Sequence, residues 1–172
     1  MRPFALFAIG LGLTACSPPA APTAAAAPGP DATFRAKLER GMCLGPCPVY
    51  AVEIDAAGLV TFTGQHSNAE PSAPCQGRRQ WRISPEAVAR LEATIDQGRF
   101  FSFKDDYSAS VTDMPGMTVT ITRRGVTKRV IDYMGQMVGM PPAMIQIEDA
   151  IDIAANTKAC VVAPAPQPSP AY

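Results

Sequence analysis

The sequence predicts an α+β domain in which an antiparallel sheet of hairpins carries two helices packed on one face, as a two-layer sandwich. Three patterns point to this class. Several short segments alternate apolar and polar residues, turn residues separate those segments, and two longer segments carry apolar residues at helical spacing. Elements that each have one apolar face bury those faces by packing as two layers.

Alternation with a period of two is typical of half-buried strands. It occurs in six segments: 33–40, 49–54, 59–63, 79–83, 117–122 and 126–133. The turn sequence Asp-Ala-Ala-Gly at 55–58 predicts a first hairpin, and Arg124-Gly125 predicts a second.

Two segments have the signals of helices. Ser84 is a good N-cap, Pro85 suits the first helical position, and apolar residues follow at helical spacing until Gly98. A second helix is predicted after Pro141-Pro142, with Met144, Ile147 and Ile151 on its apolar face. Between the helix and the second hairpin, residues 105–108 and Asp113 are predicted to form an acidic loop whose side chains cap turns.

Residues 1–16 are predicted to be a lipoprotein signal peptide. Arg2 is followed by an apolar run at 4–13, which rises only about 15 Å as a helix and is too short to span a bilayer. Leu13-Thr14-Ala15-Cys16 resembles a bacterial lipobox, which implies cleavage before Cys16 and lipid attachment to it. Ser17, in place of the Asp that favours inner-membrane retention, implies the outer membrane.

The remaining chain divides into three parts by composition. Residues 17–30 contain six Ala and five Pro and are predicted to be an extended tether of roughly 40 Å. Residues 31–160 are predicted to form a single domain, long enough to bury its own core. Residues 161–172, with four prolines, are predicted to be a disordered tail. We therefore expect a protein held on the bacterial cell envelope by its N-terminal lipid, facing the periplasm.

Charge excludes one class of partner. The 15 Lys plus Arg equal the 15 Asp plus Glu, so no basic surplus is available to neutralise the phosphates of a nucleic acid. The basic residues do occur in pairs, at 78–79 with Arg82, at 123–124 and at 128–129. If their strands are neighbours, they form one positive stripe, which is either a solvated face or a contact for an acidic partner or lipid phosphate.

Four cysteines remain for the domain after Cys16 is used for lipid attachment. An exported protein favours disulfides, and Cys43, Cys47, Cys75 and Cys160 allow three pairings. The Gly-Pro turn between Cys43 and Cys47 favours a bond between them, which leaves Cys75 with Cys160.

A run of residues resembles a known family. Cys43, Gly45, Cys47, Pro48 and Tyr50 match the Cys-x-Gly-x-Cys-Pro-x-Tyr run of domain-of-unknown-function family 6438. Further similar features follow along the chain: Phe100, Phe101, Tyr107, Asp113 with Pro115, Asp132-Tyr133 and Gly135. The resemblance implies a fold shared by envelope proteins and no established activity. Cys75 and Cys160 are outside the pattern.

Two alternatives to a binding or structural domain remain open. Cys43 and Cys47 suit a thiol–disulfide redox protein, although the strand expected after Cys47 is not the helix that lowers a thiol pKa. The methionines at 134, 137, 140 and 144 are soft ligands that suit Cu(I), although methionines at helical spacing more often fill a core.

No catalytic or cofactor-binding set is predicted. The sole histidine, His66, is expected in a polar loop without the further ligands that a zinc site needs. No nucleophile, base and orienting group converge in the sequence. We therefore expect no cofactor and no metal, and a domain that binds an envelope protein or ligand or supports structure.

Overall fold

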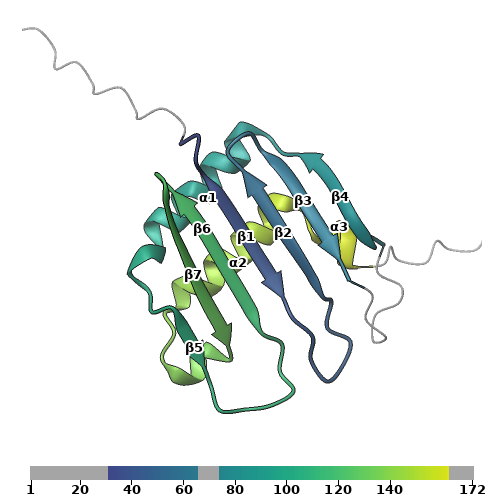
Figure 1. Cartoon of the computed structure of the whole chain (residues 1–172), viewed down its shortest axis with the longest axis vertical. Helices are drawn as coiled ribbons and strands as arrows, with labels where there is room; N and C mark the ends of the chain where they lie inside the picture. The colour runs from purple at the N-terminus through teal and green to yellow at the C-terminus, as the bar shows by residue number, and fades with distance from the viewer. Residues whose placement is uncertain (1–30, 66–73, 163–172) are drawn as a thin grey trace, which may run out of the picture.

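In the described part of the chain, one sheet of seven strands forms the first layer. The computed structural model describes residues 31–65 and 74–162. Its strands lie in the order β4-β3-β2-β1-β6-β7-β5, with all pairs antiparallel except β5 with β7 (Figure 1). The strands are β1 (Arg35–Arg40), β2 (Tyr50–Asp55), β3 (Leu59–Gly64), β4 (Gly77–Arg82), β5 (Asp106–Ser108), β6 (Met117–Arg123) and β7 (Val126–Tyr133).

Helices cover one face of the sheet as the second layer, which confirms the predicted α+β sandwich (Figure 1). The helices are α1 (Pro85–Gln97), α2 (Pro142–Ala155) and the short α3 (Lys158–Val161), with 3-10 turns η1 (Phe100–Ser102) and η2 (Gly135–Val138). Ser84 caps α1 as predicted, since its side chain accepts a hydrogen bond from the Ala87 N–H at 3.3 Å. Val161 belongs to α3 and not to a tail.

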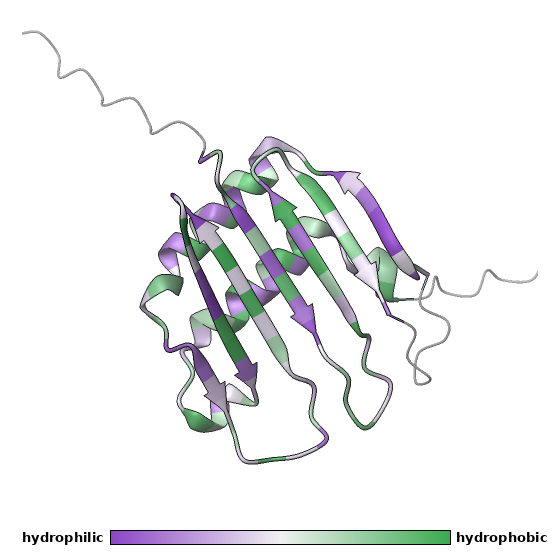
Figure 2. Cartoon of the chain, in the orientation of Figure 1, coloured by the Kyte–Doolittle hydropathy of each residue, from purple (hydrophilic) through white to green (hydrophobic). Residues whose placement is uncertain are grey.

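The core lies between the layers and is centred on β1. This strand pairs with β2 on one side and β6 on the other, so Leu38 stands in register between Val52 and Val119. All three side chains are fully buried. Alternation therefore decides which face each residue occupies. Figure 2 shows the resulting change from hydrophobic to hydrophilic residues along the strands.

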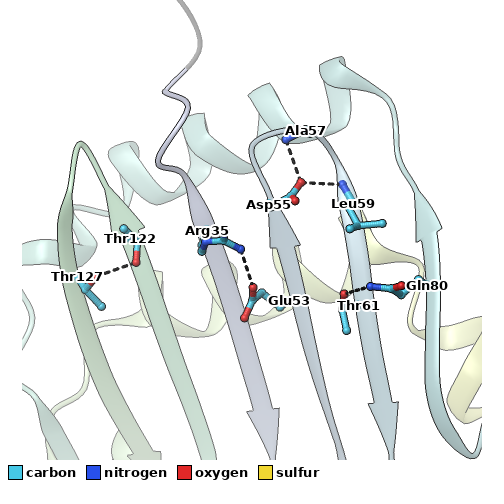
Figure 3. A network of polar contacts seen from close by, with 9 residues as sticks. All are labelled: Arg35, Glu53, Asp55, Ala57, Leu59, Thr61, Gln80, Thr122 and Thr127. Atoms are coloured by element: carbon cyan, nitrogen blue, oxygen red, sulfur yellow. Dashed lines mark hydrogen bonds and ion pairs between the residues drawn. The ribbon is translucent and has the colours of Figure 1, made fainter.

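The opposite face of the sheet is polar and uncovered by the described residues. Its side chains pair across strands, as Figure 3 shows: Arg35 with Glu53 at 3.0 Å, Gln80 with Thr61 at 2.9 Å, and Thr122 with Thr127 at 2.8 Å. Such cross-strand pairs stabilise a sheet by about 0.2–1 kcal/mol each. This face is therefore held in order without a second helical layer.

Residues 106–108 of the predicted acidic loop form a strand instead, with Asp105 directly before it. Tyr107 is buried while Asp106 and Ser108 are exposed, and the three residues pair in parallel with β7. Backbone bonds from Ile131 N to Asp105 O and from Ala109 N to Tyr133 O extend the pairing. Three residues are too short to show a period, so the segment could not be distinguished from a turn in the sequence.

The strands that carry the basic pairs are not all neighbours, so the pairs do not form a single positive stripe. β4 lies at one edge of the sheet, and β3, β2 and β1 separate it from β6 and β7. Arg123 also points to the helical layer, where it pairs with Glu92 at 2.9 Å and Asp96 at 2.7 Å on α1. The arginines of β4 are thus a separate group.

The four cysteines pair as the sequence favours. Cys43 bonds to Cys47 within the β1–β2 loop. Cys75 bonds to Cys160, which ties the chain before β4 to α3, 85 positions later. None of the helices at 31–65 and 74–162 is long and apolar enough to cross a membrane.

The two disulfides should differ in their effect on stability. A bond stabilises mainly by restricting the unfolded chain, and more so for a longer loop. We expect Cys75→Ala/Cys160→Ala to lower the free energy of unfolding by about 4 kcal/mol and Cys43→Ala/Cys47→Ala by about 2 kcal/mol. Urea unfolding of both double variants and the parent measures this. Equal losses would show that loop length does not govern the two contributions.

Candidate functional site

Two loops meet at one end of the sheet. The disulfide loop, residues 41–49, joins β1 to β2, and the β5–β6 loop, residues 109–116, lies beside it (Figure 1). The Gly41 N–H donates to the Gly116 carbonyl at 2.8 Å, and the Leu44 N–H donates to the Asp113 carbonyl at 3.0 Å. These bonds join the family-like cysteine run and the family-like Asp113 into one surface, which we call the loop end.

The loop end exposes large apolar side chains. Met42 is 74% exposed and Leu44 is 84% exposed, whereas Cys43 and Cys47, which form the disulfide, are half-buried. Met114, on the adjoining loop, is 38% exposed. The disulfide closes the loop and so limits how far these side chains can withdraw from water. Apolar residues held at a surface in this way are typical of contact sites.

One carboxylate holds both stems of the disulfide loop. Arg40 ends β1 and Tyr50 begins β2, and both reach Asp152 on α2. The Arg40 Nε and Nη2 donate to Asp152 Oδ2 at 3.0 and 2.8 Å, and the Tyr50 hydroxyl donates to Oδ1 at 2.7 Å. Thr157 donates to the same Oδ1 at 2.7 Å. The loop is therefore fixed to the helical layer at its base.

A hollow of about 670 Å³ lies beside the disulfide loop. The loop contributes Met42 to its wall, and the neighbouring strands contribute Glu39, Ser108, Arg129 and Tyr133. Acceptors, donors and an aromatic ring thus share one wall with an exposed methionine. This mixture suits a polar rim around an apolar contact.

Buried carboxyl groups lie under the loop end. Glu148 on α2 is 2% exposed, and its Oε1 has no hydrogen-bond partner among the described residues. Asp132 on β7 is 3% exposed and accepts from the Gly135 N–H at 2.7 Å. Burial, reinforced by the negative charge of Asp132, raises the pKa of Glu148 from its ordinary 4.5 to about 8. The charge of Arg40 acts in the opposite direction and is smaller in effect. Glu148 therefore holds a proton at neutral pH.

Other family-like residues serve the packing of this end. The Tyr133 hydroxyl accepts from the Met114 N–H at 3.3 Å and so supports the β5–β6 loop. A Cβ on Gly135 would lie 2.8 Å from the Tyr107 Cβ and 2.9 Å from Asp132 Oδ1. Only glycine fits this approach without a shift.

The residues that the sequence suggested for Cu(I) binding or thiol–disulfide exchange do not form one site in the described structure. Met140 and Met144 are buried in the core, whereas Met137 is 64% exposed. Cys47 leads through Pro48 into β2 and not into a helix N-terminus. Cys16 and His66 lie outside the described residues. Within 31–65 and 74–162, no group of three or more His, Cys, Asp or Glu side chains is placed to hold a metal ion.

The buried polar cluster of Arg40, Tyr50, Glu148 and Asp152 was not predicted from the sequence. A signal for one member was present, because Glu148 occupies the helical position between Ile147 and Ile151 on the apolar stripe of α2. Asp152 gives no such signal. It lies at the border of the apolar stripe, where an acidic residue exposed to solvent is equally common.

The fold and the two bonded cysteine pairs define a disulfide-bonded α+β domain. The family model described as "Domain of unknown function (DUF6438)" matches residues 35–155, and the chain belongs to this family. The resemblance seen in the cysteine run is thereby confirmed. No curated protein matches the chain.

The raised pKa of Glu148 predicts how stability depends on pH. The folded state keeps a proton that the unfolded chain releases above pH 4.5, so this group lowers stability as pH rises from 4.5 towards about 8. Glu148→Gln stays neutral, and we expect it to remove that decline and raise the free energy of unfolding at pH 7 by an amount of the order of 3 kcal/mol.

Urea unfolding across this pH range measures the effect. Asp149→Asn is the matched control, because Asp149 is adjacent on α2 but exposed. An unchanged pH profile for Glu148→Gln would mean that Glu148 is ionised in the folded protein.

Proposed function

We propose that this chain is the precursor of a lipid-anchored bacterial envelope protein, and that its disulfide-bonded domain binds an envelope protein through the loop end. The anchor is supported by the lipobox-like Leu13-Thr14-Ala15-Cys16 after a short apolar run. The Pro- and Ala-rich 17–30 would serve as the tether, and Ser17 favours the outer membrane. The two disulfides suit the oxidising periplasm.

The observation that carries the binding function is the fixed, exposed apolar tip of the disulfide loop. Leu44 and Met42 are held in water by a disulfide, by the Asp113 carbonyl and by the Asp152 cluster at the stems. A loop backbone that is already held in place loses little conformational entropy on binding, which favours a protein contact.

The position of the tip relative to the chain entry supports the same function. Asp31 and Thr33 accept hydrogen bonds from the N–H groups of Arg124 and Gly125, so the described chain begins beside the β6–β7 turn. The disulfide loop follows the other end of β1, about 20 Å away by strand rise. A tether entering at the first end would present the tip away from the lipid.

Lipid attachment is tested on the purified mature protein. We expect intact mass to show an N-terminus at Cys16 that carries a diacylglyceryl group and an amide-linked acyl chain, because the lipobox resemblance implies both. Cys16→Ser should give an unlipidated form that leaves the membrane fraction. A mature protein that begins elsewhere, without added lipid mass, would contradict the anchor.

The binding tip is tested by photo-crosslinking in cells. A photoreactive amino acid at Leu44 should give one discrete heavier product, because a partner covers that side chain. Ile153 on α2 is the matched control, since it is 79% exposed against 84% for Leu44. We expect no discrete product from position 153. The same pattern at both positions would argue against a contact specific to the loop end.

The reduction potential of the Cys43–Cys47 bond distinguishes a redox role from a structural one. A structural bond should have a reduction potential below about −300 mV, so that glutathione does not reduce it. Exchange between about −120 and −230 mV, the range of dedicated redox proteins, would favour the thiol–disulfide alternative instead.

A further inference from the structure

The sheet has one long edge strand. β4 ends the strand order beside β3 and has six residues, whereas β5 at the other edge has three (Figure 1). No described strand pairs with the outer side of β4. Such an edge offers unpaired N–H and C=O groups to an additional strand.

Along β4, the backbone groups of successive residues point alternately toward β3 and away from the sheet. The Ile83 N–H donates to the Gly58 carbonyl at 2.9 Å, so residue 83 faces β3. Alternation then turns the backbone N–H and C=O of Arg78, Gln80 and Arg82 away from the sheet. No described residue forms a backbone hydrogen bond with those groups.

Contacts on both sides hold this edge in place. The Cys75–Cys160 disulfide and a bond from the Cys75 N–H to the Cys160 carbonyl at 3.1 Å fix the chain before β4. The Trp81 Nε1 donates to the Ala155 carbonyl at 3.0 Å and fixes the strand to the end of α2. A strand already ordered loses little entropy when another strand adds to it.

The edge is strongly basic. Arg78, Arg79 and Arg82 are exposed, and none forms an ion pair with a described residue. The neighbouring β3 has no charged residue, so nothing on that strand neutralises them. β4 is the most continuously hydrophilic strand in Figure 2.

We propose that β4 binds an extended acidic segment of a partner protein as an added antiparallel strand. In antiparallel pairing, residues opposite Arg82, Gln80 and Arg78 place their side chains on the same open face. The fitting segment therefore carries Glu or Asp at two positions four apart, with a small polar residue midway. Main-chain bonds supply affinity, and the arginines select the acidic sequence.

A second copy of the chain does not fit this edge. Antiparallel pairing of two β4 strands about Gln80 sets Arg78 of one copy opposite Arg82 of the other, and like charges in that position destabilise a pair. The arginines thus disfavour self-pairing and favour an acidic partner. The β4 edge is a different surface from the loop end, and binding there does not depend on the lipid anchor.

The experiment measures binding of a dye-labelled peptide to the full chain with both disulfides formed. The probe is Thr-Val-Glu-Val-Thr-Val-Glu-Val-Thr, read by fluorescence anisotropy. We expect saturable binding that weakens as NaCl rises from about 0.05 to about 0.5 M. A peptide with Lys in place of Glu should not bind. A peptide N-methylated on the amides that face β4 should bind roughly tenfold more weakly, because it lacks the main-chain donors.

Three variants test the edge itself. Arg78→Glu/Arg82→Glu should weaken binding by roughly tenfold or more through the lost charge pairs. Gln80→Pro removes an outward N–H without changing charge and should weaken binding as strongly. Arg90→Glu/Arg99→Glu is the matched control, because it makes the same charge change on exposed residues around α1 and should leave affinity unchanged. Near-ultraviolet circular dichroism from Trp81 checks that each variant is folded.

Each other outcome overturns the proposal. Equal binding of the N-methylated peptide, or equal binding by a folded Gln80→Pro variant, would show contact through charge alone without strand addition. Absence of peptide binding would show that the arginines only protect the edge from self-pairing. A dimer of the full chain that Gln80→Pro dissolves would identify a second copy as the occupant. If Gln80→Pro does not fold, the N-methylated peptide decides the same point.

Discussion

The Asp152 carboxylate is the contact on which the arrangement of the loop end depends. It receives Arg40 from the end of β1 and Tyr50 from the start of β2, so one side chain on α2 joins both stems of the disulfide loop. Because Arg40 and Tyr50 also stand opposite each other in the sheet register, the loop cannot tilt without breaking these bonds. Removing one member of such a partly buried cluster would leave the others unpaired.

Charge balance beneath that contact explains the unusual state of Glu148. Glu148 lies near the acidic side chains of Asp132 and Asp152 and near the Arg40 guanidinium, which already pairs with Asp152. An ionised Glu148 would be a buried charge whose Oε1 accepts no hydrogen bond from the part of the chain that the structure describes. Protonation removes this cost, and the neutral side chain then packs with the apolar stripe of α2.

The sheet presents two surfaces that the helical layer leaves uncovered. The loop end is apolar, closed by a disulfide and joined to a second loop. The β4 edge is basic, extended and fixed by the other disulfide and by Trp81. Each disulfide thus stiffens one surface, which allows a single small domain to hold two different contact chemistries in place.

The sequence by itself determined most of the architecture, because alternation in the strands, the Ser84 cap and the stripe on α2 are local patterns set by backbone periodicity. Only the tertiary structure decided the strand order, and with it which charges meet. Arg40 and Asp152 are 112 positions apart, and β4 is separated from β7 by four strands, so no local period relates them. Burial of Glu148 and the outward edge of β4 follow from that order. The physical reason is that long-range packing places charges together or apart, whereas local periodicity only assigns each residue to a face.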